Sequence, residues 1–203
     1  MKKLTKQKIK KTIAAIGLWS IFWFGAQGMY VLPFSPLNNL NLNLSPDLSF
    51  LFYTLWILSV AGIGLILWKK TINDFSFLKV KNKKVLFLYI VPIIIAIVLL
   101  IRGNGFNDIN RPLYVAAIAS STFIAQDMLT FGFLQTYLEK ILSKNAAAII
   151  TFVTFFTAHL AFQWSMGALI VLLGAMVFSY LRYRTKNIYL LDIIHISFLL
   201  LPL

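Results

Sequence analysis

The two histidines of this chain, His159 and His195, are its only ones, and each lies within a long apolar segment that carries almost no charge. A third apolar segment carries the adjacent polar residues Gln126 and Asp127. Placing a charge at the depth of a bilayer costs about 2.5–3.5 kcal/mol on insertion scales, so residues kept there usually face a bundle interior and serve a function. One such histidine would be interpreted as a hydrogen-bonding link between helices. Two histidines with an aspartate favour a site, and these three side chains with a water would also suit catalytic zinc.

Four further residues lie three or four positions from these groups, a spacing that places side chains on one helix face: Phe131, Phe155, Asp192 and Leu199. Asp192 precedes His195 by three residues. We expect it to orient the imidazole and fix its tautomer, as carboxylates behind a functional histidine do.

The composition predicts a membrane protein. Of 203 residues, 60% are hydrophobic and 12% are charged, with a mean hydropathy of +0.82. Soluble domains average about 25% charged residues, which they need to cover their surface. The chain has no cysteine, so it has neither a disulfide nor a thiolate metal site.

Seven apolar segments have about the length that crosses a bilayer, which takes roughly 17–25 helical residues. They are residues 12–34, 49–68, 85–101, 112–142, 146–162, 166–183 and 188–203, of which the third, fifth and seventh are near the lower limit. In lipid they should be helical, since backbone polar groups must then be satisfied within each segment. The predicted fold is therefore all-α, a polytopic bundle of about seven transmembrane helices. Residues 1–203 form one membrane domain that begins with a basic leader, residues 1–11.

The basic residues predict orientation. Seventeen of the nineteen lie in the leader and in alternate connections, which leaves only Arg102 and Arg111 in the others. The positive-inside rule then places the N-terminus in the cytoplasm and the C-terminus outside the cell membrane. The net charge of +13 thus reflects topology and contact with anionic lipid headgroups rather than nucleic-acid binding.

Three motifs carry a family resemblance. Gln126-Asp127-x-x-x-Phe131, Phe155-x-x-x-His159 and His195-x-x-x-Leu199 resemble, in order and spacing, the motifs of the CPBP family of CAAX proteases and bacteriocin-processing or self-immunity proteins, which suggests a bacterial source. The resemblance covers residues 116–203. The family pattern is Glu-Glu-x-x-x-Arg, Phe-x-x-x-His and His-x-x-x-Asn or Asp on an all-helical membrane core. It implies an intramembrane endopeptidase in which glutamate and histidine activate water and the second histidine with the Asn helps to hold the oxyanion.

The chain departs from that pattern at the positions of the family's catalytic residues. Gln126 replaces the first glutamate, Asp127 shortens the second, Phe131 replaces the arginine and Leu199 replaces the Asn or Asp. An amide is no general base near neutral pH, and losing one oxyanion donor costs about 10²–10³ in rate. Losing the glutamate and the arginine together is consistent with an intact core, because a stranded buried charge would cost about 3–5 kcal/mol.

The leading interpretation is a CPBP-type protein with degraded catalytic motifs that binds a hydrophobic peptide or a membrane protein, as in bacteriocin self-immunity. A second is an active intramembrane endopeptidase that uses Asp127, His159 and His195, with zinc as the candidate metal. A third is a subunit of a peptide-export or transport complex. It has the least support, because the sequence shows no inverted repeat.

Overall fold

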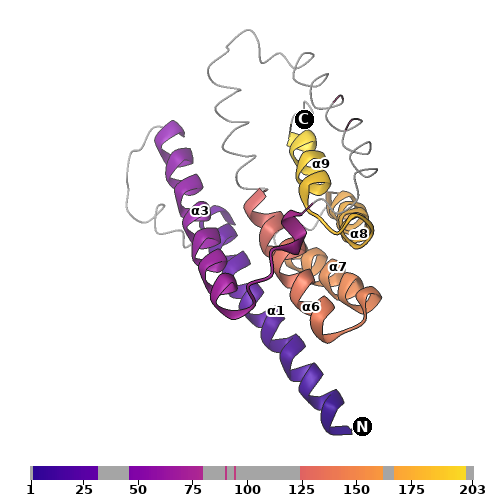
Figure 1. Ribbon diagram of the computed structural model, residues 1–203. Helices are drawn as coiled ribbons and strands as arrows, with labels where there is room; N and C mark the ends of the chain where they lie inside the picture. The colour runs from indigo at the N-terminus through magenta and orange to yellow at the C-terminus, as the bar shows by residue number, and fades with distance from the viewer. Residues whose placement is uncertain are drawn as a thin grey trace.

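The computed structural model describes residues 2–31, 46–79, 90, 94, 124–161 and 167–199. Within these ranges every regular element is helical, which confirms the all-α class. The helices, labelled as in Figure 1, are α1 (Lys2–Val31), α3 (Pro46–Thr71), the 3-10 turn η1 (Ser76–Leu78), the π-helix η4 (Met128–Leu134), α6 (Gln135–Ile141), α7 (Lys144–Leu160), α8 (Gly167–Thr185) and α9 (Tyr189–Leu199).

These helices match six of the predicted segments in position, but not all in length. α1 begins ten residues before the predicted segment and takes in the basic leader. α9 has 11 residues, about 16 Å of helix at 1.5 Å per residue. The predicted segment 85–101 lies outside the described residues, apart from single helical positions at 90 and 94. In the part of the chain that the structure describes, no helix combines the length and the apolar character needed to cross a membrane, so the predicted count of seven crossings is not confirmed.

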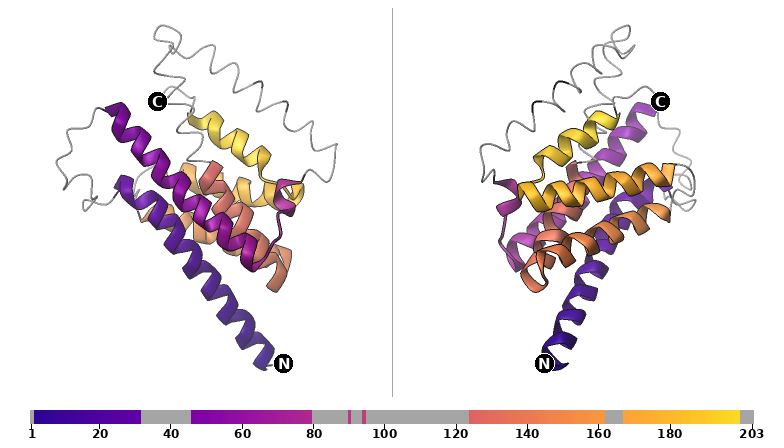
Figure 2. Two further views of the ribbon diagram at one scale, coloured as in Figure 1. Left: turned by 60° about the vertical axis from the view of Figure 1, so that its left-hand side comes forward. Right: turned by 90° about the vertical axis from the view of Figure 1, so that its right-hand side faces the viewer.

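The π-helix η4 occupies the centre of this arrangement. α1 packs along α3, and α7 packs against α8, so that these helices form two pairs (Figures 1 and 2). η4 contacts α1, α3, α7 and α8 and continues directly into α6. A side chain at this point of the chain can therefore meet partners from several helices.

Aromatic packing fixes η4 against the first half of the chain. The rings of Trp68 and Phe133 stack with centroids 5.0 Å apart, and Phe77 meets Phe133 edge to face at 5.5 Å. Phe77 also lies over Gly132, where an added Cβ would come within 2.9 Å of the Phe77 ring. Gly132 is therefore required for this close contact, because a fully buried ring cannot move aside cheaply.

Asp74 ties the turn after α3 to α6. Its carboxylate accepts a hydrogen bond of 3.0 Å from the backbone N–H of Ser76 and forms a 2.9 Å ion pair with Lys140. Partial burial by itself would raise the pKa of Asp74, but the Ser76 bond and Lys140 outweigh this effect and lower the pKa to about 2. The folded state therefore favours the ionised carboxylate.

We expect Asp74→Asn to destabilise the protein by about 1 kcal/mol or less, since the pair is partly exposed to solvent. The folded pKa lies below the unfolded value, so the contribution is present above about pH 4 and is lost as the pH falls through about 2. Thermal unfolding of wild type and Asp74→Asn in detergent, at pH 5 and at pH 2, measures this contribution to stability. A difference between wild type and variant that stays constant across that range would contradict the assignment.

Candidate functional site

The helical turn before η4 directs two adjacent polar residues at two different helices. Gln126 is 5% exposed and Asp127 is fully buried. Neighbouring residues on a helix diverge by about 100°, so their side chains cannot share one partner face. Gln126 reaches His159 of α7, while Asp127 reaches His195 of α9. The structure thus brings together the four residues that the sequence singled out, as two separate pairs.

The first pair joins an amide to an imidazole. Gln126 Nε2 lies 3.1 Å from His159 Nε2, and His159 Nδ1 lies 2.9 Å from the carbonyl oxygen of Phe155. A carbonyl only accepts, so Nδ1 carries the proton and Nε2 carries the lone pair. The Gln126 N–H therefore donates to that lone pair, and the basic nitrogen of His159 is occupied.

The second pair joins a carboxylate to an imidazole. His195 Nδ1 lies 3.1 Å from each carboxylate oxygen of Asp127. Nδ1–H donates to the carboxylate, which leaves the lone pair on Nε2. The carboxylate that bonds His195 is therefore Asp127, whereas Asp192, which was expected to orient the ring, interacts through its side chain with Asp127.

Aromatic rings support both imidazoles. The His159 ring lies 4.2 Å from Phe155 and 5.1 Å from Trp23, and the His195 ring lies 5.1 Å from Phe178. Fully buried Phe131 packs on Phe155 at 5.1 Å and on Phe178 at 5.9 Å. Phe131 therefore fills the space between Phe155 and Phe178, the rings that contact the two imidazoles. Leu199 ends α9, and its side chain lies outside the described residues.

Residues 108–201 match the family model of the Rce1-like type II CAAX prenyl endopeptidases. Over these residues, the chain is similar to the CPBP family. The match confirms the resemblance carried by the three motifs and spans nearly the same region. No curated protein and no solved structure matched the chain. The CPBP match supports a membrane location, because the family is membrane-associated.

The CPBP site of this chain does not form the predicted zinc grouping of His159, His195 and Asp127. Across the described ranges, no three His, Cys, Asp or Glu side chains are gathered as metal ligands. The reason is the divergence of residues 126 and 127. His159 is paired with an amide nitrogen, which is a donor and does not bind a metal, while Asp127 turns toward α9.

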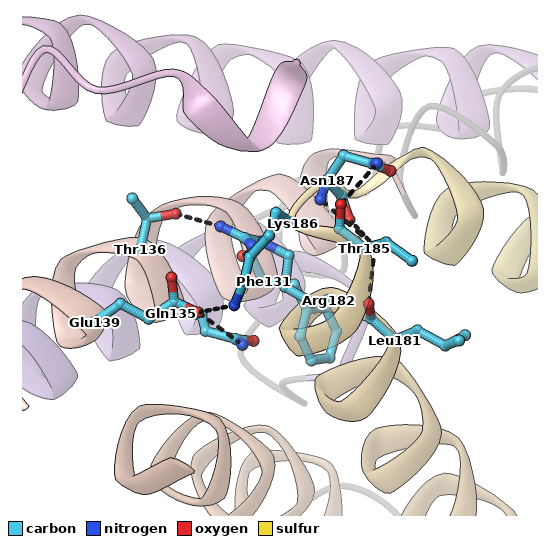
Figure 3. Close-up of polar contacts among 9 residues, drawn as sticks. All are labelled: Phe131, Gln135, Thr136, Glu139, Leu181, Arg182, Thr185, Lys186 and Asn187. Carbon is cyan, nitrogen blue, oxygen red and sulfur yellow. Dashed lines mark hydrogen bonds and ion pairs between the residues drawn. The ribbon is translucent and has the colours of Figure 1, made fainter. Parts of the chain in front are cut away.

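Arg182 is a site residue that the sequence analysis missed. The charge pattern places it among the loop charges, but it is 1% exposed and is buried beside the three motifs. Its Nε donates to the carbonyl of Phe131 at 3.0 Å, and its Nη2 donates to Thr136 Oγ1 at 2.9 Å (Figure 3). The available signal was the position of Arg182 inside the predicted segment 166–183, where a charge needs partners.

A tight turn places α9 relative to α8. Lys186 adopts a left-handed conformation with φ of 63°. The Thr185 hydroxyl donates to the carbonyl of Leu181 at 2.8 Å, and Asn187 Nδ2 donates to the carbonyl of Thr185 at 3.2 Å (Figure 3). The next residue, Ile188, donates its N–H to the carbonyl of Phe77 at 3.2 Å. These bonds fix the start of α9, and hence the position of His195 against Asp127.

Proposed function

We propose that this CPBP-family protein acts in the cell membrane by binding a hydrophobic peptide or a membrane protein segment, without the family's Glu–His hydrolysis. Protection against a membrane-active bacteriocin is the role that this proposal favours. The supporting observation is the 3.1 Å contact between Gln126 Nε2 and His159 Nε2. It occupies the nitrogen that would act on water or on a peptide bond.

The chemistry of the pair explains why this contact matters. A general base must be within hydrogen-bond reach of a proton that it can accept. Gln126 has no basic atom, and His159 can accept a proton only after it gives up the bond from the amide. The family pattern supplies a carboxylate at this position, and the substitution removes it. The site keeps its shape and loses the group that would activate water.

A second candidate function has one observation in its favour. Asp127 and His195 form a carboxylate–imidazole pair that orients the ring and presents Nε2 as a base, as the acid of a catalytic triad does for its histidine. Hydrolysis by this pair would not use Gln126. The two candidates therefore differ in whether His195 is needed for peptide cleavage.

Cleavage assays separate the two. The full chain is reconstituted in phospholipid vesicles and incubated with a quenched fluorescent peptide that carries a prenylated CAAX terminus, and with unmodified hydrophobic peptides. We expect no cleavage above that of a His159→Ala/His195→Ala double variant. Cleavage that persists in His159→Ala and disappears in His195→Ala would overturn the proposal and establish the second candidate.

A cell assay tests the binding role directly. Cells that express the chain are challenged with a panel of membrane-active bacteriocins, next to cells that express each single histidine variant at equal membrane levels. We expect protection against at least one bacteriocin in all three strains. Protection that needs either imidazole would count against a non-catalytic role.

A further inference from the structure

An apolar cavity of about 430 Å³ lies between α1, α3 and the η4–α6 segment, away from the histidine pairs. Its volume falls within the range of roughly 300–1,000 Å³ that is typical of small-ligand sites. The wall is almost entirely apolar and aromatic and includes Trp19, Phe22, Gly64, Trp68, Leu129 and Phe133. α1 and α3, which form two of its sides, precede the region of the family match.

The cavity walls are held in place by hydrogen bonds. Trp19 Nε1 donates to Thr130 Oγ1 at 3.1 Å, and Trp68 Nε1 donates to the carbonyl of Asp74 at 2.9 Å. Both indoles thus have partners for their polar atom and present their apolar rings to the cavity. The cavity is pre-formed for an apolar chain and offers little to a polar solute.

A basic patch continues the cavity along α1. The cavity begins at Ala14 and Ala15 and extends to Phe22 on this helix. Lys11 and Lys8 precede Ala15 by four and seven residues, so they lie on the same face, about 6 and 10 Å further along the axis. Both lysines are exposed, and Figure 2 shows α1 continuing past the end of α3 at this point.

The lysines are available to an external anion. Within the described ranges neither Lys8 nor Lys11 takes part in an ion pair. Asp74, the carboxylate that follows α3, is already paired with Lys140 at 2.9 Å. Positive charge at one end of an apolar cavity complements a molecule with an anionic head and a hydrocarbon tail.

We propose that this cavity binds one acyl chain of an anionic phospholipid, whose phosphate lies against Lys11 and Lys8. The chain contacts the indoles of Trp19 and Trp68, and the headgroup lies at the basic end of α1. A zwitterionic lipid would fill the cavity with a weaker headgroup contribution, because its positive group offsets the charge of the phosphate.

Brominated lipids test the proposal, because a brominated acyl chain quenches a tryptophan that it touches. The full chain is reconstituted in vesicles of unlabelled phosphatidylcholine, and brominated phosphatidylglycerol or brominated phosphatidylcholine is added in increasing mole fraction. We expect quenching that saturates at low mole fraction with phosphatidylglycerol and rises gradually with phosphatidylcholine. Equal curves for the two lipids would overturn the proposed headgroup contact.

Two pairs of variants locate the site. Lys8→Gln/Lys11→Gln should raise the half-saturating phosphatidylglycerol fraction roughly 30-fold. Lys6→Gln/Lys10→Gln removes the same charge from positions nine and five residues before Ala15, which face away from Ala15, and should change the half-saturating fraction less than twofold. Ala14→Phe should abolish saturable quenching by filling the cavity, whereas Ile13→Phe on the opposite face should not. Ala14 is exposed, so this change leaves the protein core intact.

The outcomes also separate other occupants of the cavity. Saturable quenching that survives Ala14→Phe would place the lipid elsewhere and overturn the proposal. Absence of saturable quenching, with a change in oligomeric state in Ala14→Phe, would assign the cavity to a second copy of the chain. Neither result depends on whether the histidine site cleaves peptides, so the lipid site and the proposed function are tested separately.

Discussion

Arg182→Ala is expected to destabilise the protein by about 2–4 kcal/mol. The substitution leaves two buried acceptors without a donor, the carbonyl of Phe131 and the hydroxyl of Thr136. Each stranded buried polar group costs about 1–3 kcal/mol, and the removed side chain also leaves a cavity. Arg182 is 1% exposed, so water cannot readily replace the lost donors.

The effect should extend to the CPBP site, because Arg182 and Phe178 lie four residues apart on one face of α8. Arg182 binds the carbonyl of Phe131, while Phe178 packs on the Phe131 ring and on His195. The π-helical turn that contains Phe131 is a less common geometry, whose carbonyls need partners outside the usual helical pattern. Arg182 supplies one such partner and so holds η4 against α8.

Matched variants make this prediction specific. Arg184→Ala removes the same side chain from an exposed position two residues further along, and we expect a change within about 0.5 kcal/mol. Arg182→Lys keeps the charge but places its three donors on one nitrogen, whereas Nε and Nη2 of Arg182 reach the two acceptors separately, so the loss of stability should lie between those of the two alanine variants. Denaturant unfolding in mild detergent, followed by tryptophan fluorescence, measures all three. Equal losses in Arg182→Ala and Arg184→Ala would rule out the role assigned to Arg182.

The meeting of four polar residues could be predicted from the sequence, but their pairing could not. Polar groups in apolar segments must find one another, and the motif order indicated that Gln126, Asp127, His159 and His195 converge. Which atoms meet depends on the rotation of the helix, and adjacent residues point about 100° apart. That rotation gives an amide–imidazole pair and an acid–imidazole pair, where the sequence analysis allowed three ligands around one metal.

Two other features, the π-helix and the burial of Arg182, could not be predicted from the sequence for physical reasons. The π-helix depends on tertiary contacts such as the close approach of Phe77 to Gly132, and no local pattern encodes such contacts. The charge pattern groups Arg182 with Arg184, because both follow the apolar part of the same segment. Their environments are opposite, since Arg182 is buried and Arg184 is exposed.

Asp127→Ala is expected to lower the free energy of unfolding by about 2–4 kcal/mol, because it too leaves a buried polar group without its partner. The fully buried carboxylate of Asp127 accepts from His195 Nδ1 and also interacts with Asp192. Without it, the His195 N–H loses its acceptor, and the ring is no longer held in one tautomer. Unfolding measured as for Arg182 reports the loss of stability.

Asp127→Asn is the matched variant, and it separates packing from chemistry. An asparagine keeps one oxygen to accept from His195 Nδ1 and offers an N–H to Asp192, so we expect stability within about 1 kcal/mol of the wild type. It removes the negative charge that would stabilise a protonated His195 during hydrolysis. In a serine protease, where the amide also leaves the histidine in the wrong tautomer, the same acid-to-amide change lowers kcat by about 10⁴. Any cleavage by the Asp127–His195 pair should therefore disappear in Asp127→Asn, although this variant still folds. If Asp127→Asn is instead as unstable as Asp127→Ala, the ionic contact itself holds α9 in place.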